Sequence, residues 1–415
     1  MLSTLKIALR NLMRFGRRTL LTSTLITLGI VAVLLFIAVA GSFKAMMISQ
    51  FTDSVLGHVQ VHHRGYVASI DTLPLNLNMR PGMTARLSQV LGQMPEIEAW
   101  SERVKVGAMF SNFTETTSIR VNGIDPAREA AATPALSGRI SDGARELAAL
   151  QRGEILIPAL LARGMKVKVG DAIVLVATNR DGSVNGKTLT VRGIVDGVSG
   201  PSGRDGYVHV DDVRELLRMT EPEVSEVVIR LKDPSRLAAF NAKLVKALSG
   251  LTNKDGKQVL DVHTWADLSP FSSIARMIDV LTLFIKIMLV SIVLVSIMNV
   301  MIMAVYERIR EIGTISAIGT PPRRILALFL TEGLLLGAGG AVIGTAIAYA
   351  AVQALNAWKL TFDFGQQRGL VLAPSLPLAD MAVVAGLVIV MALLASLQPA
   401  WKASRMDPVK ALGHV

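Results

Sequence analysis

Hydrophobic residues are distributed very unevenly along this chain. Four uncharged runs of at least 20 residues occupy 19–43, 287–306, 333–358 and 381–401. About 20 consecutive apolar residues are enough for a helix to cross the hydrocarbon core of a bilayer. The pattern therefore predicts a membrane α-helical protein with four transmembrane helices, which we place at 19–43, 274–306, 325–358 and 381–401.

The stretch between the first two of these helices has a different pattern. Residues 44–273 have ordinary soluble composition and are numerous enough to enclose a core of their own. Alternating or β-rich segments predict strands, a turn at Asp181-Gly182 predicts a hairpin, and an amphipathic segment predicts a helix at 234–248. The strands are expected at 58–63, 117–125, 154–177 (with a short helix inside), 189–195 and 226–231. We expect a large mixed α/β extracytoplasmic domain here, after a first helix that continues to Gly57.

The charge distribution gives the orientation. Lys and Arg gather in the short segments 1–18, 307–324 and 402–415, whereas the loop 359–380 holds only Lys359 and Arg368. The positive-inside rule then predicts that both termini and the 307–324 loop are cytoplasmic. Most of the net charge of +11 lies in these segments. We expect no nucleic-acid partner, because the sequence has no basic stripe with interleaved aromatic residues.

The N-terminal segment resembles a cleavable signal peptide in one respect. A basic start and an apolar stretch precede Ala38-Val39-Ala40. The uncharged run of 25 residues is longer than the apolar part of signal peptides, which is roughly 7–15 residues. We therefore expect an uncleaved membrane anchor.

The sequence offers no catalytic residues and no metal or cofactor site. The absence of cysteine excludes disulfides and Cys zinc sites. His58, Gln60 and His62 share one strand face, which we interpret as a polar face because no further ligand lies nearby in the sequence. The segment 182–188 (GSVNGKT) is one residue short of a Walker A loop and lies between predicted strands. The chain is therefore not expected to be an enzyme, and any ATP must be bound by another chain.

A charged helix is predicted between the second and third spans. It has the sequence ERIREIGTISAIGTPPRR from Glu307 to Arg324, and Pro321-Pro322 ends it. A short charged helix between two membrane-length runs is suited to being pushed by a partner outside the bilayer.

The third span begins with a carboxylate and a stripe of glycines. Gly333, Gly337, Gly340 and Gly344 lie at offsets of four, three and four, which allows close approach of another helix. That helix could belong to the same chain or to a second subunit. Glu332 would be costly inside a membrane, so we expect it at the interface beside Arg323 or Arg324. Lys286 is expected to extend to the outer interface.

Four blocks of residues carry a resemblance to a known family. The first is ALRNL at 8–12 with RRT at 17–19, and the second is ERIREIG at 307–313 with AIG at 317–319. The third is EG at 332–333, and the fourth is PA at 399–400 with KAS at 402–404, DP at 407–408 and AL at 411–412. These blocks resemble FtsX-like ABC transporter permeases, the class that includes the LolC and LolE lipoprotein-releasing subunits and the membrane part of the MacB exporter. The domain after the first span matches more loosely, through Asn122–Pro126, Lys168–Asp171 and Trp265.

The resemblance implies a permease in the bacterial inner (cytoplasmic) membrane with a periplasmic domain. Its partners would be a second permease copy or a paralogue and a dimer of cytoplasmic ABC ATPase subunits, which bind ATP and Mg. The 307–319 block would be the coupling helix, with charged side chains making charge-assisted contacts and Ile312, Ile315 and Ile318 forming an apolar ridge. The ATPase-coupling residues are then Glu307, Arg308, Arg310, Glu311, Ile312, Gly313, Ile315, Ala317, Ile318 and Gly319.

The expected cargo is a lipoprotein or another amphiphile, released or exported from the inner membrane. By resemblance, acyl chains would lie between the first and second spans, although the same residues could equally pack a dimer. These residues are Phe36, Phe43, Met46, Met47, Met277 and Leu281. Two alternatives stay open: a tripartite efflux exporter that docks on a periplasmic chaperone or adaptor, and mechanotransmission to a cell-wall hydrolase without transport.

Overall fold

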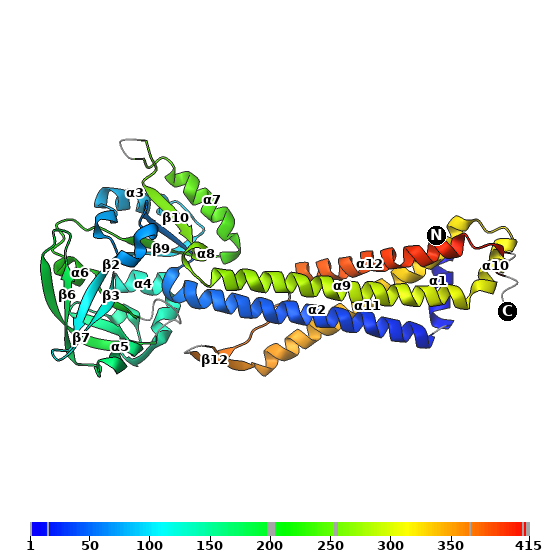
Figure 1. Cartoon of the computed structure of the whole chain (residues 1–415), viewed down its shortest axis with the longest axis horizontal. Helices are drawn as coiled ribbons and strands as arrows, with labels where there is room; N and C mark the ends of the chain where they lie inside the picture. Colours follow the sequence, from blue (N-terminus) through cyan, green and yellow to red (C-terminus); the bar gives the residue numbers. More distant parts are fainter. Residues whose placement is uncertain are drawn as a thin grey trace. The chain divides into compact units, whose positions relative to one another are not determined.

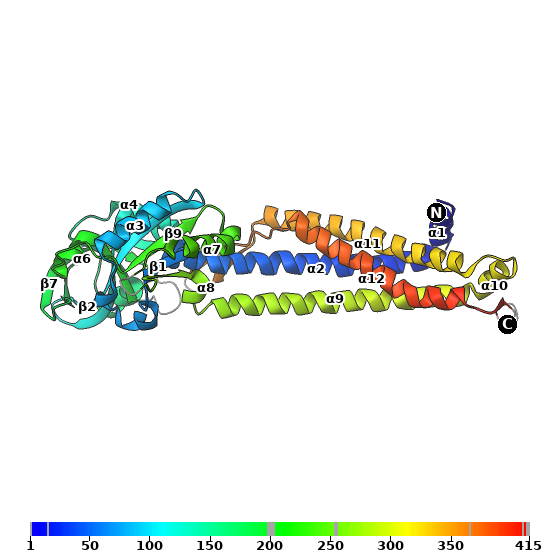
Figure 2. The same cartoon turned by 90° about the horizontal axis from the view of Figure 1, so that it is seen from above.

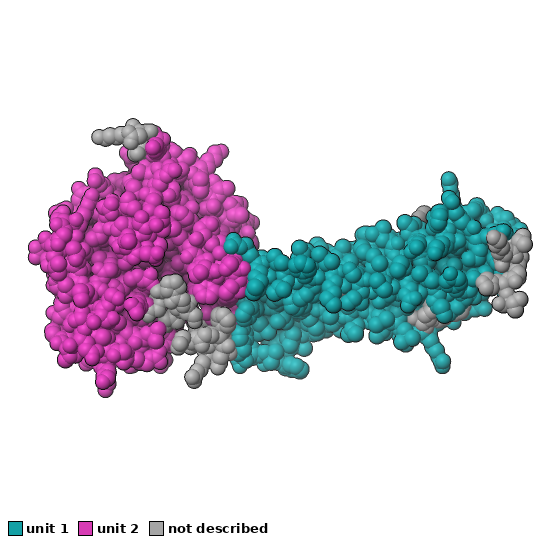
Figure 3. Space-filling view, in the orientation of Figure 1, with its two compact units in different colours: residues 1–45, 275–362, 369–415 teal, residues 46–274, 363–368 magenta. Residues whose placement is uncertain are grey.

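The computed structural model describes residues 2–14, 16–196, 204–252, 256–364, 367–408 and 411. The chain divides into two compact units, coloured separately in Figure 3. The helical unit consists of residues 1–45, 275–362 and 369–415, and the α/β domain consists of residues 46–274 and 363–368.

Four long helices have the length and apolar composition to cross a membrane, as the sequence predicts (Figure 1). They are α2 (Gly16–Phe51), α9 (Ser272–Glu307), α11 (Pro322–Trp358) and α12 (Leu378–Ser404). This unit also contains two shorter helices, α1 (Leu2–Arg14) and α10 (Ile309–Ala317). The sequence analysis did not predict α1 as a helix. A short hairpin, β11 (Thr361–Phe364) and β12 (Gln367–Val371), connects α11 to α12.

The core of the helical unit is built from one stripe of each long helix. On α9 the buried stripe is Val293, Ile297, Met301 and Ala304, spaced three or four residues apart, as expected for one face of a helix. Ile26 and Phe329 from α2 and α11 are fully buried in the same core. The rest of α9 is largely exposed, and Figure 2 shows this helix along one side of the unit.

The α/β domain contains a ten-stranded mixed sheet. Its strand order is β10-β1-β9-β2-β3-β8-β5-β7-β4, and β6 pairs with both β2 and β7, so that β2, β3, β8, β5, β7 and β6 close a ring. The strands are β1 (Val59–His63), β2 (Ile97–Ser111), β3 (Thr116–Ile124), β4 (Ile140–Gly143), β5 (Glu154–Pro158), β6 (Ala172–Thr178), β7 (Val184–Val195), β8 (Asp205–His209), β9 (Glu226–Leu231) and β10 (Leu260–Thr264).

The domain has separate cores on the two parts of this sheet. Leu87 and Leu91 of one helix and Phe240 and Leu244 of another cover β1, β9 and β10. A second core fills the ring of strands. The long strand β2 contributes to both cores, because its first residues pair with β9 and its last residues pair with β3 and β6. The helices are α3 (Pro81–Gly92), α4 (Pro126–Ala132), α5 (Ala159–Gly164), α6 (Val210–Leu216), α7 (Leu237–Leu248) and α8 (Trp265–Leu268).

The strands predicted from the sequence are present with shifts of a few residues. Gly57, with φ 65°, follows the last turn after α2, and Gly182, with φ 84°, lies in the β6–β7 hairpin. The segment 182–188 therefore lies on a strand hairpin, where it has no helix N-terminus to complete a phosphate loop. The polar face of His58, Gln60 and His62 is buried.

Candidate functional site

The charged block between the second and third spans forms a distinct short helix. The α-helical dihedrals of α9 stop at Arg308, which has φ −114° and ψ 17°, and α10 begins at Ile309. Gly319, with φ 93°, follows α10, and Pro321 is the N-cap of α11. Figure 1 shows α10 and α1 at the same end of the helical unit. The sequence pattern predicts this helix correctly.

A buried ion pair joins the beginning of α10 to α11. Arg308 Nη1 donates a hydrogen bond to Glu332 Oε1 over 2.9 Å, and both side chains are buried. Asn11 Nδ2 of α1 donates to the same Glu332 oxygen over 2.7 Å. Arg308 also lies over the ring of Phe329, with 5.6 Å from its guanidinium carbon to the ring centroid. Three helices therefore meet at one carboxylate.

The pair extends to the surface through a second carboxylate. Arg308 Nε donates to Glu311 Oε2 over 3.0 Å, and Arg14 Nη1 lies 3.6 Å from the other oxygen of Glu311. Burial of charges is costly unless they are paired and hydrogen-bonded, and this network supplies both conditions.

The expected position of Glu332 beside Arg323 or Arg324 is wrong. Arg324 precedes Glu332 by eight residues on the same helix, which is a rise of about 12 Å, too far for direct contact. Both arginines are exposed, whereas Glu332 is buried against Arg308. The sequence analysis missed the pair because its members lie 24 residues apart and meet only when α9, α10 and α11 fold back on one another.

The structure divides the predicted ATPase-coupling residues into a buried and an exposed group. Arg308, Ile312 and Gly313 are buried, and Ile312 belongs to the core of the helical unit. The predicted ridge therefore does not form as one exposed surface. Its exposed part consists of Ile315 and Ile318, of which Ile318 is 81% exposed. The remaining exposed residues are Glu307, Arg310, Glu311, Ala317 and Gly319.

The glycine stripe of α11 packs against helices of the same chain. A methyl group added at Gly333 or Gly337 would overlap Ser396 or Ala392 of α12. At Gly340 and Gly344 it would overlap Ile26 and Ile30 of α2. Of the two alternatives left by the sequence, the described contacts therefore correspond to packing within the chain.

The predicted cargo residues lie in different environments. In the helical unit, Met277 and Leu281 are exposed on α9, and the Phe43 ring lies 6.2 Å from that of Phe362. Phe36 is half-buried. Met46 and Met47 belong to the α/β domain, where Met47 is fully buried.

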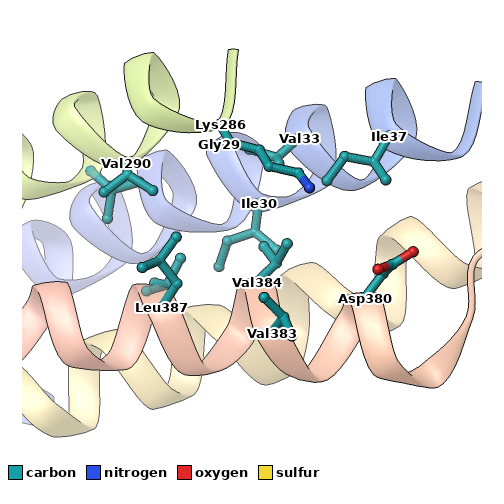
Figure 4. Close-up of a pocket in the computed structure, with 12 residues that line it drawn as sticks. Gly29, Ile30, Val33, Ile37, Lys286, Val290, Asp380, Val383, Val384 and Leu387 are labelled. Atoms are coloured by element: carbon teal, nitrogen blue, oxygen red, sulfur yellow. The ribbon is translucent and has the colours of Figure 1, made fainter. Parts of the chain in front are cut away.

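A small apolar cavity lies between α2, α9 and α12 (Figure 4). Its volume is about 50 Å³, and Lys286 and Asp380 are the charged residues among those that line it. The side chain of Lys286, which the sequence places at the outer interface, thus borders this cavity. The other lining residues are glycine or aliphatic.

The α/β domain contains a second buried charge network, which sequence reasoning missed. The fully buried Arg103 donates from Nε to Glu129 over 3.1 Å and from Nη1 to Glu226 over 2.9 Å. Lys105 lies 3.0 Å from the other oxygen of Glu226. Burial opposes ionisation of Glu226, but Lys105 and Arg103 hold the pKa of Glu226 well below its usual range. These residues come from β2, α4 and β9, and no local sequence pattern connects them.

The histidines of β1 do not form a metal centre with neighbouring ligands. His62 lies 3.6 Å from Glu226 and stacks on Tyr66 at 5.3 Å between ring centroids. Among the described residues, no group of three or more His, Cys, Asp or Glu side chains is arranged to hold a metal ion.

Comparison with known families covers both units. Residues 19–247 match the MacB-like periplasmic core domain, and residues 283–408 match the FtsX-like permease C-terminal family. The chain is 23% identical to the lipoprotein-releasing system transmembrane protein LolC of Neisseria meningitidis, over 94% of this chain and 92% of that protein. It is 29% identical to the macrolide export ATP-binding/permease protein MacB of Nitrobacter winogradskyi, over 46% of this chain and 28% of that protein.

These matches agree with the presence of four long apolar helices and a large α/β domain, and with the resemblance carried by the 307–319 and 399–412 blocks. The permeases of this class are components of ABC transporters. The chain therefore belongs to the family of permeases that combine a MacB-like periplasmic core domain with an FtsX-like permease C-terminal region.

Proposed function

We propose that this chain is the transmembrane subunit of an ABC transporter and couples ATP hydrolysis by a separate cytoplasmic ATPase to movement of its α/β domain. The observation that carries the proposal is the junction of α10 with the long helices. Part of α10 is exposed for a partner, while the buried Arg308–Glu332 pair and Ile312 anchor it to α11 and the core. A force applied to α10 would reach α11 through this anchor.

The sidedness of this proposal rests on the distribution of basic residues. Segments 1–18, 307–324 and 402–415 carry most of the excess positive charge, which favours the cytoplasmic side. Both termini and α10 would then lie in the cytoplasm of a bacterial cell and the α/β domain in the periplasm. The similarity to LolC and MacB supports the inner membrane as the location.

The ATPase would contact the exposed side of α10. Arg310, Glu307 and Glu311 offer charges of both signs, and Ile315 and Ile318 offer an apolar surface further along the helix. Charge-assisted hydrogen bonds around an apolar centre are typical of specific interfaces. ATP and Mg would be bound by the ATPase dimer.

The cargo proposed is a lipoprotein or another amphiphile. The name of the LolC relative, which the chain matches over nearly its whole length, supports lipoprotein release. Met277 and Leu281 present flexible apolar side chains on the exposed face of α9, which suits acyl chains of varied shape. The similarity to MacB supports a second candidate, an exporter that works with a periplasmic partner.

The test is purification of the tagged full chain in mild detergent, followed by mass spectrometry of the proteins and lipids bound to it. We expect a stoichiometric ABC ATPase together with a second permease copy or a paralogue. Acylated cargo would support release of lipoproteins, and a periplasmic adaptor without acylated cargo would support the exporter. Absence of any ATPase under conditions that keep the chain folded would overturn the proposal.

A further inference from the structure

The α/β domain contains a cavity with both apolar and charged lining residues. It lies where the end of α2, the segment 268–271 and the strands β2, β3 and β8 come together, and all of its lining residues belong to this domain. Its volume is about 240 Å³. An engineered protein cavity of about 150 Å³ is large enough to bind benzene, so this cavity has room for a small organic group.

The helical segments contribute a mainly apolar part of the lining. Phe51, the last residue of α2, stacks on Phe271, with 4.3 Å between the ring centroids. Val55, Leu56 and Leu268 also line the cavity. Aromatic rings and aliphatic side chains together offer a surface on which an apolar group is shielded from water.

The strands contribute charged residues to the same cavity. Lys105 of β2, Arg120 of β3 and Asp205 of β8 all line it. Arg120 and Asp205 are direct neighbours in a parallel strand pair, and 3.0 Å separates Arg120 Nε from Asp205 Oδ1, so these two charges offset each other. Asp71 is the remaining charged residue of the lining, and its exposed position allows solvent and salt to screen it.

Lys105 is the lining cation with hydrogen-bonding capacity left for a ligand. Its Nζ lies 3.0 Å from Glu226 Oε2, and its side chain is 19% exposed. Glu226 is fully buried, and its other oxygen accepts a hydrogen bond from Arg103 Nη1 over 2.9 Å. Within the described part of the chain, the Lys105 ammonium has no second hydrogen-bonding partner. An ammonium carries three N–H donors, so donors remain for an anion in the cavity.

We propose that this cavity binds a small amphiphile with one carboxylate, such as a medium-chain fatty acid, with the carboxylate on Lys105 and the apolar part against Phe51 and Phe271. A charge-assisted hydrogen bond fixes the head, and a largely apolar lining with a few polar groups is typical of ligand pockets. A single ammonium matches a single negative charge, whereas a second charge on the ligand would stay uncompensated. The inference goes beyond the proposed function, because it assigns a ligand site to the α/β domain that does not depend on the ATPase.

The test is fluorine NMR of ω-fluorooctanoate with the full chain in lipid nanodiscs. Two probes of the same chain length, ω-fluorooctanol and ω-fluorooctyltrimethylammonium, carry a neutral and a cationic head. Titration of empty nanodiscs corrects for partition of each probe into lipid. We expect saturable binding of the octanoate, roughly tenfold to a hundredfold tighter than that of the alcohol, as for one hydrogen bond to a charged group. The ammonium probe should show no saturable binding.

Variants test the two parts of the cavity separately. Lys105→Met combined with Glu226→Gln removes the ammonium without leaving its buried partner charged, and should reduce the affinity for octanoate to that for the alcohol. Leu268→Trp should fill the apolar part and abolish the binding of both probes. Leu160→Trp is the matched control, because Leu160 is 63% exposed on α5 and does not line the cavity. The unfolding temperature of each variant shows whether it is folded.

Three results would overturn the proposal. Equal or tighter binding of the neutral or cationic probe would contradict the assigned head group. Unchanged octanoate binding by a folded Lys105→Met, Glu226→Gln chain would exclude Lys105 as its partner. Unchanged octanoate binding by Leu268→Trp would place the probe elsewhere on the chain. Each of these leaves the proposed permease function standing if an ATPase still co-purifies, and absence of the ATPase leaves the ligand site standing if octanoate still binds.

Discussion

Arg308 Nη1 lies 2.9 Å from Glu332 Oε1, and this contact joins the residue before α10 to the third turn of α11. Both side chains are buried, and Asn11 of α1 donates to the same oxygen. The pair connects the start of α10 to a membrane-length helix, which is the connection that the proposed coupling requires.

Breaking the Arg308–Glu332 pair should destabilise the helical unit strongly. Glu332→Ala leaves the buried Arg308 with only the peripheral Glu311, and removing one member of a buried pair costs about 3 kcal/mol or more. We expect a clear drop in the thermal unfolding temperature of the purified full chain. Arg323→Gln is the control, because Arg323 is exposed at the start of α11.

The same pair can be tested for direct coupling with a double-mutant cycle. Arg308→Met combined with Glu332→Met should cost less than the sum of the single substitutions, by about 1–3 kcal/mol, because the double variant leaves no buried charge unpaired. Strict additivity of the two stability losses would show that the contact contributes nothing by itself.

The two faces of α10 should respond differently to a negative charge. Ile318 is 81% exposed and Ile312 is 4% exposed. Ile318→Asp should leave thermal stability unchanged and reduce the amount of co-purified ATPase, whereas Ile312→Asp should lower thermal stability because it places a charge in the core. If Ile318→Asp and the unsubstituted chain retain equal amounts of ATPase, the Ile318 side chain does not contribute to the interface.

Because α11 packs closely against its neighbours, substitutions at its different glycines should differ in their effect on stability. A methyl group at Gly337 would overlap Ala392, whereas at Gly339 it meets nothing within 4 Å. Gly337→Ala should therefore destabilise the chain by about 1–3 kcal/mol through overpacking. Gly339→Ala should be neutral or slightly stabilising, since alanine is the better helix former. The unfolding temperatures of the two variants test this expectation, and equal values would contradict the close packing of α11 against α12.

Arg103 should be essential to the α/β domain. Arg103→Leu leaves two buried carboxylates, Glu129 and Glu226, without their shared cation, which costs about 3–5 kcal/mol. Arg128→Leu is the matched control, because Arg128 is largely exposed and its ion pair with Asp125 is long, at 4.0 Å. Limited proteolysis of the full chain should show rapid cleavage within 46–274 for the first variant only. Equal protection of both variants would refute the structural role of Arg103.

Acid should weaken the same network. The pKa of Glu226 is held well below its ordinary value of 4.5, so its ionisation stabilises the folded domain above that pH. The contribution is lost as the pH falls from about 4.5 through the lower pKa of the folded state. We expect the unfolding temperature to decrease over this range, and to decrease less steeply in Glu226→Gln. Identical acid profiles of the two proteins would contradict the assignment.

Much of the architecture follows from local sequence. The four apolar runs, the helix after Glu307, the break at Gly57 and the turn at Asp181-Gly182 all correspond to observed elements. Each depends on interactions within a few residues, such as the length of an apolar run or the backbone freedom of one glycine. The glycine stripe was also visible as a close-packing surface, although its partners were not.

The tertiary structure decided which residues of these elements meet. Glu332 pairs with Arg308 instead of a neighbouring arginine. Ile312 is buried in the core, while Ile318 is exposed. Arg103 donates hydrogen bonds to two carboxylates from other elements. The sequence alone determined the four long helices, the helix after Glu307 and several strands and turns, because backbone preference and apolar periodicity are local. It did not predict α1 or the strands β2, β4, β8 and β10. Partners of buried charges depend on how distant elements pack, so only the fold could determine them.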